Sequence, residues 1–146
     1  MTQQHPVNII MIEDDEGHAR LIEKNIRRAG ISNRITHFTD GTSALDHIFT
    51  APEGPVRNGP ALILLDLNLP DMSGTDILTR IKADPGLKRT PVVVLTTTDD
   101  KLEIERCYDL GCNVYITKPV NYENFASAIR QLGLFLSVIQ VPDAGA

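Results

Sequence analysis

Cysteine is scarce in this chain of 146 residues, and its two thiols, Cys107 and Cys112, stand five positions apart. That spacing fits neither a CxxC redox motif nor a zinc-binding pattern. The polar segment 1–6 has no apolar core, so it does not read as a signal peptide. We therefore expect a cytoplasmic protein with reduced thiols, both of them packed as small hydrophobic residues near a helix end.

Long hydrophobic runs and basic clusters are also absent. The longest nearly apolar stretch, 132–141, is interrupted by Gly133, Ser137 and Gln140, and a membrane span would need ~18 apolar residues. The net charge is −5, and no run of lysine or arginine forms a basic stripe. These absences argue against a membrane-spanning protein and against a nucleic-acid-binding surface. We expect neither a membrane nor a nucleic acid among the partners.

The apolar residues that are present fall into short blocks, which predict five strands alternating with five helices. The expected strands cover 7–12, 34–38, 61–65, 91–95 and 113–117. The expected helices cover about 19–29, 40–49, 73–83, 100–110 and a final segment from about 122 onward. Short continuous apolar strands are typical of a parallel sheet with helices on both faces. The pattern therefore predicts an α/β sandwich.

Residues that end helices support this division of the chain. Ser73 and Asp100 stand where an N-cap is expected, and Gly30 and Gly111 stand where a C-cap is expected. The segment 51–60 holds three prolines and two glycines, which predicts a loop.

Polar side chains follow four of the five expected strands. Their positions are Glu13, Asp14 and Asp15 after the first strand, Asp66 after the third, Thr96 and Thr97 at the end of the fourth, and Lys118 after the fifth. Ligands of open α/β sheets bind beyond the carboxyl ends of the strands, so we expect these groups to form one site. Crowded carboxylates are relieved by a proton or a cation, and oxygen-only ligands suit Mg²⁺. One carboxylate could then attack phosphorus, while Lys118 and a threonine hydroxyl stabilise the charge.

Each of these acids taken alone has a simpler structural reading. An acid after a strand often caps the following helix and interacts with its dipole, and we expect this role for Asp15. Only the joint arrangement at one edge of the sheet favours a chemical site.

Four motifs carry a resemblance to the receiver domain of response regulators. They are IEDD at 12–15, LLDLNLPDMSG at 64–74, VVVLTTTDD at 92–100 and YITKP at 115–119. The resemblance implies a flavodoxin-like doubly wound fold, with strand order 2-1-3-4-5 and five helices. We expect a single receiver domain over 1–146, with a core at about 7–136 and a C-terminal extension at 137–146.

The same resemblance implies a role for each matching residue. Asp66 matches the phosphoacceptor, which binds the metal together with Glu13, Asp14 and the backbone carbonyl of Asn68. Thr96 matches the hydroxyl residue that turns toward the phosphoryl group, and Lys118 matches the lysine that pairs with it. Tyr115 matches the aromatic switch position, and Pro119 matches a proline that follows a cis peptide bond. Such a protein is a signalling phosphoacceptor, which catalyses only its own phosphorylation and dephosphorylation.

Within that family, IKADPGLKRTPVVVLTTT, CNVYITKPVN and the loop at 51–60 resemble small receiver-only regulators that pair with bacterial phytochrome histidine kinases. The resemblance implies a sensor histidine kinase as partner. It also implies a homodimer through apolar residues near the C-terminus that the core stripe does not need. The candidate dimer residues are Leu134, Phe135, Val138 and Ile139, which could instead cover the edge of the sheet.

Two other functions are disfavoured by single features. A small Mg²⁺-dependent phosphatase would carry a second aspartate two residues after its nucleophile, where this chain has Asn68. A nucleotide-binding module would have a glycine-rich loop after the first strand, where this chain has EDDEG. The four histidines, His5, His18, His37 and His47, share no spacing, and we expect surface or packing roles for them.

Overall fold

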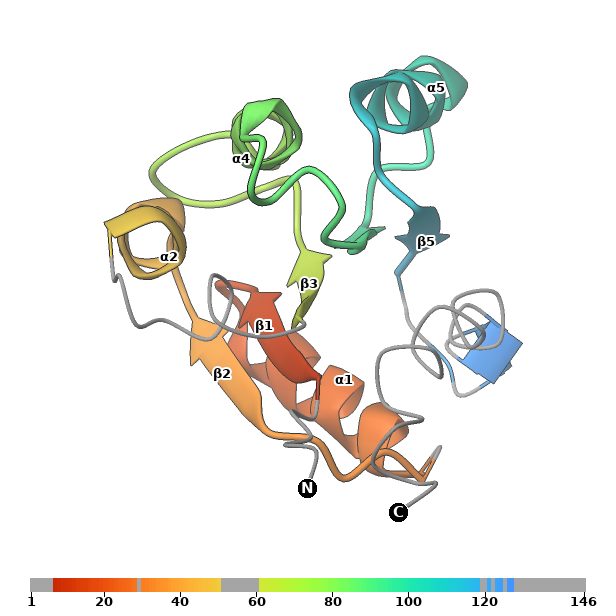
Figure 1. The fold of residues 1–146 in the computed structure, drawn as a ribbon. Coiled ribbons are helices and arrows are strands. Elements are labelled where there is room, and N and C mark those ends of the chain that lie inside the picture. The colour runs from red at the N-terminus through yellow and green to blue at the C-terminus, as the bar shows by residue number, and fades with distance from the viewer. Residues whose placement is uncertain are drawn as a thin grey trace.

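Five parallel strands form one sheet in the order β2-β1-β3-β4-β5 (Figure 1). The structure is a computed structural model, and it describes residues 7–28, 30–50, 61–118, 121, 123–124 and 126–127. The strands are β1 (Asn8–Ile12), β2 (Ile35–Phe38), β3 (Ala61–Leu65), β4 (Val92–Thr96) and β5 (Val114–Thr117). The predicted strand order and the α/β class are confirmed.

Four helices are complete within the described ranges, and each lies close to its predicted position. They are α1 (Glu16–Arg28), α2 (Gly41–Thr50), α4 (Gly74–Ala83) and α5 (Lys101–Leu110). The helix expected from about 122 and the loop expected at 51–60 lie largely outside the described residues, so both stay predictions.

The predicted capping residues lie at the ends of the helices α4 and α5. Ser73 accepts a hydrogen bond from the backbone N–H of Thr75 at the start of α4, and Asp100 accepts one from Leu102 at the start of α5. Gly111 ends α5 with a φ of 111°, a left-handed conformation that glycine adopts without a steric penalty. Asp15 accepts from the N–H of His18 at 2.9 Å, so α1 begins at Glu16, earlier than its apolar spacing suggested.

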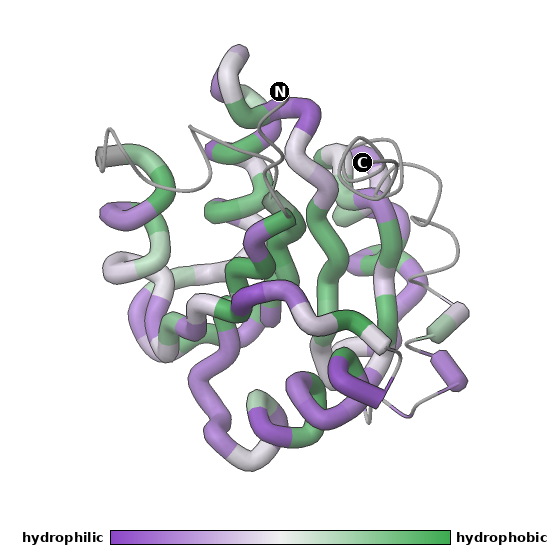
Figure 2. Tube along the Cα trace, turned by 60° about the horizontal axis from the view of Figure 1, so that its bottom comes forward, coloured by the Kyte–Doolittle hydropathy of each residue, from purple (hydrophilic) through white to green (hydrophobic). Residues whose placement is uncertain are grey.

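The sheet is covered on both of its faces. Alternate residues of the strands pack against α1 on one face and against α2, α4 and α5 on the other (Figure 1). Ile9 and Met11 belong to the α1 side, whereas Ile10 and Ile12 belong to the opposite side. Figure 2 shows the hydrophobic residues concentrated along the strands. All five residues of β3 are buried, which is why this segment has a continuous apolar pattern.

Both cysteines are buried and unpaired, as expected, and they belong to the core on the side of α2, α4 and α5. Among the described helices, none has the length and apolar character needed to cross a bilayer.

The strand register brings the predicted site residues to one edge. β1 and β3 pair with Ile12 opposite Leu65, so Glu13 and Asp66 emerge side by side. β4 and β5 pair with Thr96 opposite Thr117, and the backbone N–H of Lys118 donates to the carbonyl of Thr96 at 2.7 Å. The two strand pairs therefore end at the same edge of the sheet.

Candidate functional site

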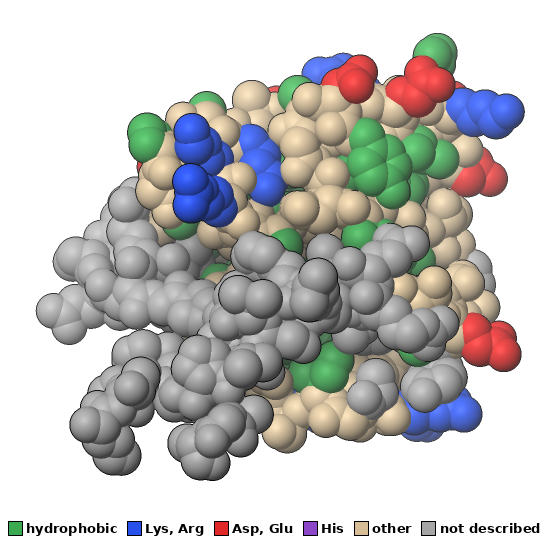
Figure 3. Space-filling view, turned by 45° about the vertical axis from the view of Figure 1, so that its right-hand side comes forward, with side chains coloured by type: hydrophobic (Ala, Val, Ile, Leu, Met, Phe, Trp, Pro, Cys, Tyr) green, Lys and Arg blue, Asp and Glu red, His purple; other side chains and the backbone are tan. Residues whose placement is uncertain are grey.

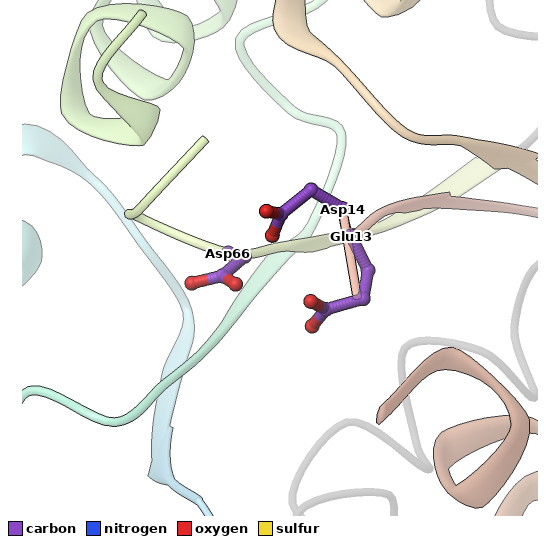
Figure 4. A group of neighbouring side chains, drawn as sticks. All are labelled: Glu13, Asp14 and Asp66. Atoms are coloured by element: carbon purple, nitrogen blue, oxygen red, sulfur yellow. The ribbon is translucent and has the colours of Figure 1, made fainter. Parts of the chain in front are cut away.

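Three carboxylates meet at the carboxyl edge of the sheet. Glu13 and Asp14 come from the end of β1 and Asp66 from the end of β3, and each has an oxygen within 4.8 Å of the others. Figure 4 shows the three side chains gathered around a common space. Glu13 and Asp66 are buried, whereas Asp14 is exposed and leaves the cluster open to solvent on its side. The structure thus brings together the three acids predicted to bind a metal.

Lys118 supplies the positive charge of this site. Its ammonium donates to Glu13 Oε1 at 2.5 Å and to Asp66 Oδ2 at 3.1 Å. The lysine side chain is only 5% exposed, so these charge-assisted bonds replace nearly all of its hydration. Three carboxylates against one ammonium leave an excess of two negative charges when all are ionised. A divalent cation with oxygen ligands fits both that excess and that donor set.

The proton affinity of Glu13 reflects this crowding. Burial raises its pKa above the ordinary value, and the neighbouring Asp66 carboxylate acts in the same direction. The hydrogen bonds from Lys118 and from the N–H of Asp15 oppose the rise in pKa. Glu13 is therefore held between a site that disfavours its charge and a lysine that stabilises it.

Asn68 links Asp66 to Thr96 through two hydrogen bonds. The backbone N–H of Asn68 donates to Asp66 Oδ1 at 3.1 Å, and its amide nitrogen lies 3.3 Å from Thr96 Oγ1. Thr96 is fully buried at the end of β4. Among the described residues, each oxygen of the Asp66 carboxylate thus has one donor, Asn68 or Lys118, which fixes the plane of the group.

The loop between β3 and α4 is held closely against the site. A Cβ atom at Gly74 would lie 2.3 Å from the carbonyl oxygen of Asp66, so only glycine allows this approach. Asp71 accepts from the N–H groups of Gly41 and Thr42, each at 2.8 Å, and also from the Thr42 hydroxyl. The Thr42 hydroxyl and these N–H groups lower the pKa of Asp71 to about 2. Asp71 thereby ties the loop to the start of α2, a role that sequence reasoning missed.

Tyr115 lies half-buried on β5, next to the segment that follows Thr96. Its hydroxyl donates to the carbonyl oxygen of Thr98 at 2.6 Å, and burial raises its pKa to about 12. The ring also packs against the core on the side of α5. The residue predicted as a switch is therefore linked to the β4–α5 segment, and its movement stays a prediction.

His18 is a member of the site that sequence reasoning also missed. Its Nδ1 lies 3.1 Å from the ammonium of Lys118 and 3.8 Å from Glu13 Oε2. The available signal was its position in the first turn of α1, directly beyond the acidic edge. His37 contacts the backbone of the same segment, since its Nε2 lies 2.7 Å from the carbonyl oxygen of Glu13.

Two sets of predicted residues cannot be placed in this site. Pro119 lies outside the described residues, and so do the candidate dimer residues Leu134, Phe135, Val138 and Ile139. The cis peptide bond and the dimer contact stay predictions.

Known proteins that are similar to this chain share one family. The profile of the response regulator receiver domain matches residues 9–130. The response regulator Rcp1 of Synechocystis is 34% identical over 142 residues, covering 95% of each chain. A receiver domain from Rhodospirillum rubrum of known crystal structure is 69% identical, with a TM-score of 0.76 and coverage of 92% of this chain and 96% of that one.

A third relative is the phosphorylated cyanobacterial phytochrome response regulator RcpA. It is 36% identical, with a TM-score of 0.75 and coverage of 92% of this chain and 96% of that one. The match of the family profile spans the strands and helices that build the acidic edge. This chain therefore belongs to the response regulator receiver domain family of two-component signalling proteins.

Proposed function

We propose that this receiver domain accepts a phosphoryl group from a sensor histidine kinase onto Asp66, in a reaction that requires Mg²⁺. The observation that carries the proposal is the position of Asp66, in contact with the Lys118 ammonium and within one cluster with Glu13 and Asp14. Glu13, Asp14 and Asp66, together with the backbone carbonyl of Asn68, would hold the cation. The bound cation supplies a Lewis acid that polarises the phosphoryl oxygens.

Three side chains carry out the rest of the phosphoryl transfer: Asp66, Lys118 and Thr96. A carboxylate oxygen of Asp66 forms the new bond to phosphorus, while the bond between phosphorus and the donor imidazole nitrogen breaks. The imidazole leaves with the electron pair of that bond and takes a proton. Lys118 neutralises charge on the transferred group, and the Thr96 hydroxyl donates to one of its oxygens.

Phosphorylation would be read out on the face that bears α5 and β5. The modification adds about two negative charges at Asp66. Thr96 then turns toward the new oxygens, and Tyr115 fills the space that it leaves, which couples the site to α5 as a two-state switch. Figure 3 shows hydrophobic side chains exposed between acidic ones on this face. Leu102 and Tyr108 of α5 are 74% and 47% exposed, as expected of a surface that contacts a partner.

The relatives suggest which kinase supplies the phosphoryl group. Several of the solved relatives are named as phytochrome or bacteriophytochrome response regulators, among them RcpA and RtBRR. We infer a phytochrome-type kinase as donor and a homodimer through the C-terminal segment. Rcp1 has a crystal structure of its Mn²⁺-bound form, so a relative of this chain binds a divalent cation.

Phosphotransfer to the Asp66→Asn variant tests the proposal. The wild type should take up one phosphoryl group from a phosphorylated histidine kinase, and the variant should take up none, since an amide is not a nucleophile toward phosphorus. Asp109→Asn, an exposed acid at the end of α5, is the matched control and should label like the wild type. Labelling of the Asp66 variant at the wild-type rate would refute the assignment. Repeated turnover of a generic phosphate ester would favour a phosphatase instead.

A further inference from the structure

His18 stands at the mouth of the acidic site without a part in the proposed chemistry. Its backbone is fixed because its N–H donates to the cap residue Asp15 at 2.9 Å. Its side chain is 45% exposed, whereas the Lys118 side chain beside it is 5% exposed. The imidazole therefore covers part of the lysine at the boundary between the site and solvent.

The ammonium of Lys118 has three N–H donors and needs three acceptors. The described residues provide three, because Nζ lies 2.5 Å from Glu13 Oε1, 3.1 Å from Asp66 Oδ2 and 3.1 Å from His18 Nδ1. Since an ammonium can only donate, Nδ1 must be the acceptor, and the proton of the neutral ring must be on Nε2. The contact with Lys118 thus selects one tautomer of His18.

The three acceptors differ in what else they do. Glu13 and Asp66 are each assigned to the cation, and Asp66 also to the phosphoryl group, so their bonds to Lys118 compete with other partners. His18 Nδ1 is assigned neither to the cation nor to the phosphoryl group, and among the described residues Lys118 is nearer to it, at 3.1 Å, than Glu13 Oε2, at 3.8 Å. Since an imidazole carries no negative charge, it also holds the ammonium without adding negative charge where the phosphoryl group arrives.

We propose that His18 is a positioning residue, whose Nδ1 holds the Lys118 ammonium against Asp66. The inference rests on the proposed function for its consequence, which is faster phosphorylation of Asp66. An ammonium already in place when charge develops requires no reorganisation at that moment. Without the imidazole, only the carboxylates of Glu13 and Asp66 hold the Lys118 ammonium. Its position then changes when these carboxylates bind the cation or the phosphoryl group.

Two substitutions separate the hydrogen bond from the bulk of the side chain. His18→Leu fills space but accepts no hydrogen bond, whereas His18→Asn places an amide oxygen at about the reach of Nδ1. With phosphoramidate as the small phosphodonor, kinase docking cannot contribute to the rate. Because this hydrogen bond joins the charged Lys118 ammonium to a ring that is 45% exposed, we expect phosphorylation of His18→Leu to be about 5- to 30-fold slower. His18→Asn should recover to within about threefold of the wild type.

Lys24→Leu is the matched control, because Lys24 is an exposed residue of the same helix. It should be phosphorylated at the wild-type rate, as followed by intact-protein mass spectrometry. Wild-type kinetics for His18→Leu, or a rate for His18→Asn as low as that of His18→Leu, would overturn the positioning role. Circular dichroism establishes that each variant is folded before its rate is compared.

A readout that does not depend on phosphorylation comes from ¹⁵N NMR of the histidine rings, at a pH where they are neutral. The wild type should show His18 with its proton on Nε2, and Lys118→Met should shift the Nδ1 resonance and change the tautomer ratio. Identical His18 resonances in the two proteins would overturn the contact. A wild-type chain that shows the contact but accepts no phosphoryl group would contradict the proposed function alone.

Discussion

Replacing Lys118 by methionine tests the electrostatic balance of the site. Methionine keeps most of the length of the side chain and its apolar packing but removes the ammonium. Glu13 and Asp66, which are 1% and 5% exposed, would then face each other without the positive charge that now contacts both. The substitution therefore measures what the charge contributes to the stability of the fold.

The expected loss follows from the burial of the partners. Removing one partner of a buried ion pair costs about 3–5 kcal/mol, because the other charge remains uncompensated. Here Asp14 opens the cluster to solvent and Glu13 can take up a proton, so we expect a smaller loss, of about 2–4 kcal/mol at pH 7 in the presence of a chelator. Urea unfolding followed by circular dichroism resolves a change of that size.

The dependence of this loss on pH separates charge from packing. Burial raises the pKa of Glu13 above its ordinary 4.5, and Lys118 is the main group that opposes the rise. Without Lys118 the folded-state pKa of Glu13 rises further. A carboxyl with a higher pKa in the folded state destabilises the fold as the pH rises through the unfolded-state value, and its cost is complete above the folded-state value. The deficit of Lys118→Met should therefore be largest at neutral pH and shrink as the pH falls toward 4.5.

Lys82 provides a matched control for this experiment. It is a partly buried lysine of α4, whose ammonium donates to the carbonyl oxygens of Thr90 at 2.7 Å and Lys88 at 3.2 Å. Its acceptors in the described residues are not carboxylates. The stability deficit of Lys82→Met should therefore stay constant as the pH falls from neutral toward 4.5. A deficit of Lys118→Met that stays constant between neutral pH and pH 4.5 would refute the reasoning and indicate lost packing.

Two further perturbations address the loop and the cation. The pKa of Asp71 is lowered from 3.8 to about 2 by the donors at the start of α2, so this carboxylate stabilises the fold above 3.8, and its contribution is lost as the pH falls toward 2. The urea midpoint of the wild type should exceed that of Asp71→Asn at neutral pH, and the difference should disappear over that acid range; a constant difference would argue against the charge. Saturation with Mg²⁺ at a hundredfold excess over its dissociation constant should raise the free energy of unfolding by about 2.7 kcal/mol. Asp14→Asn, which removes an exposed ligand, should lose most of this gain, and an equal gain in both proteins would place the cation elsewhere.

Local sequence patterns predicted the alternation of strands and helices, the caps of α4 and α5 and the edge of the sheet where the acids gather. They placed the start of α1 too late, at about 19 instead of Glu16. The apolar block ALILL predicted β3 at its observed bounds, and Ser73 and Gly111 predicted the ends at which they act. These features are local, since each depends on residues a few positions apart. The convergence of Glu13, Asp14 and Asp66 was also predictable, because parallel strands end at a common edge.

Which side chains touch across that edge depends on contacts between distant parts of the chain. His18 meets Lys118 from 100 positions away in the chain, and Asp71 caps α2 from about 30 positions away. Neither contact leaves a periodic pattern or a motif, because each depends on how α1 and the loop after β3 pack against the sheet. Local preferences encode the elements of this protein, whereas the partners of its charged side chains arise from the packing of those elements.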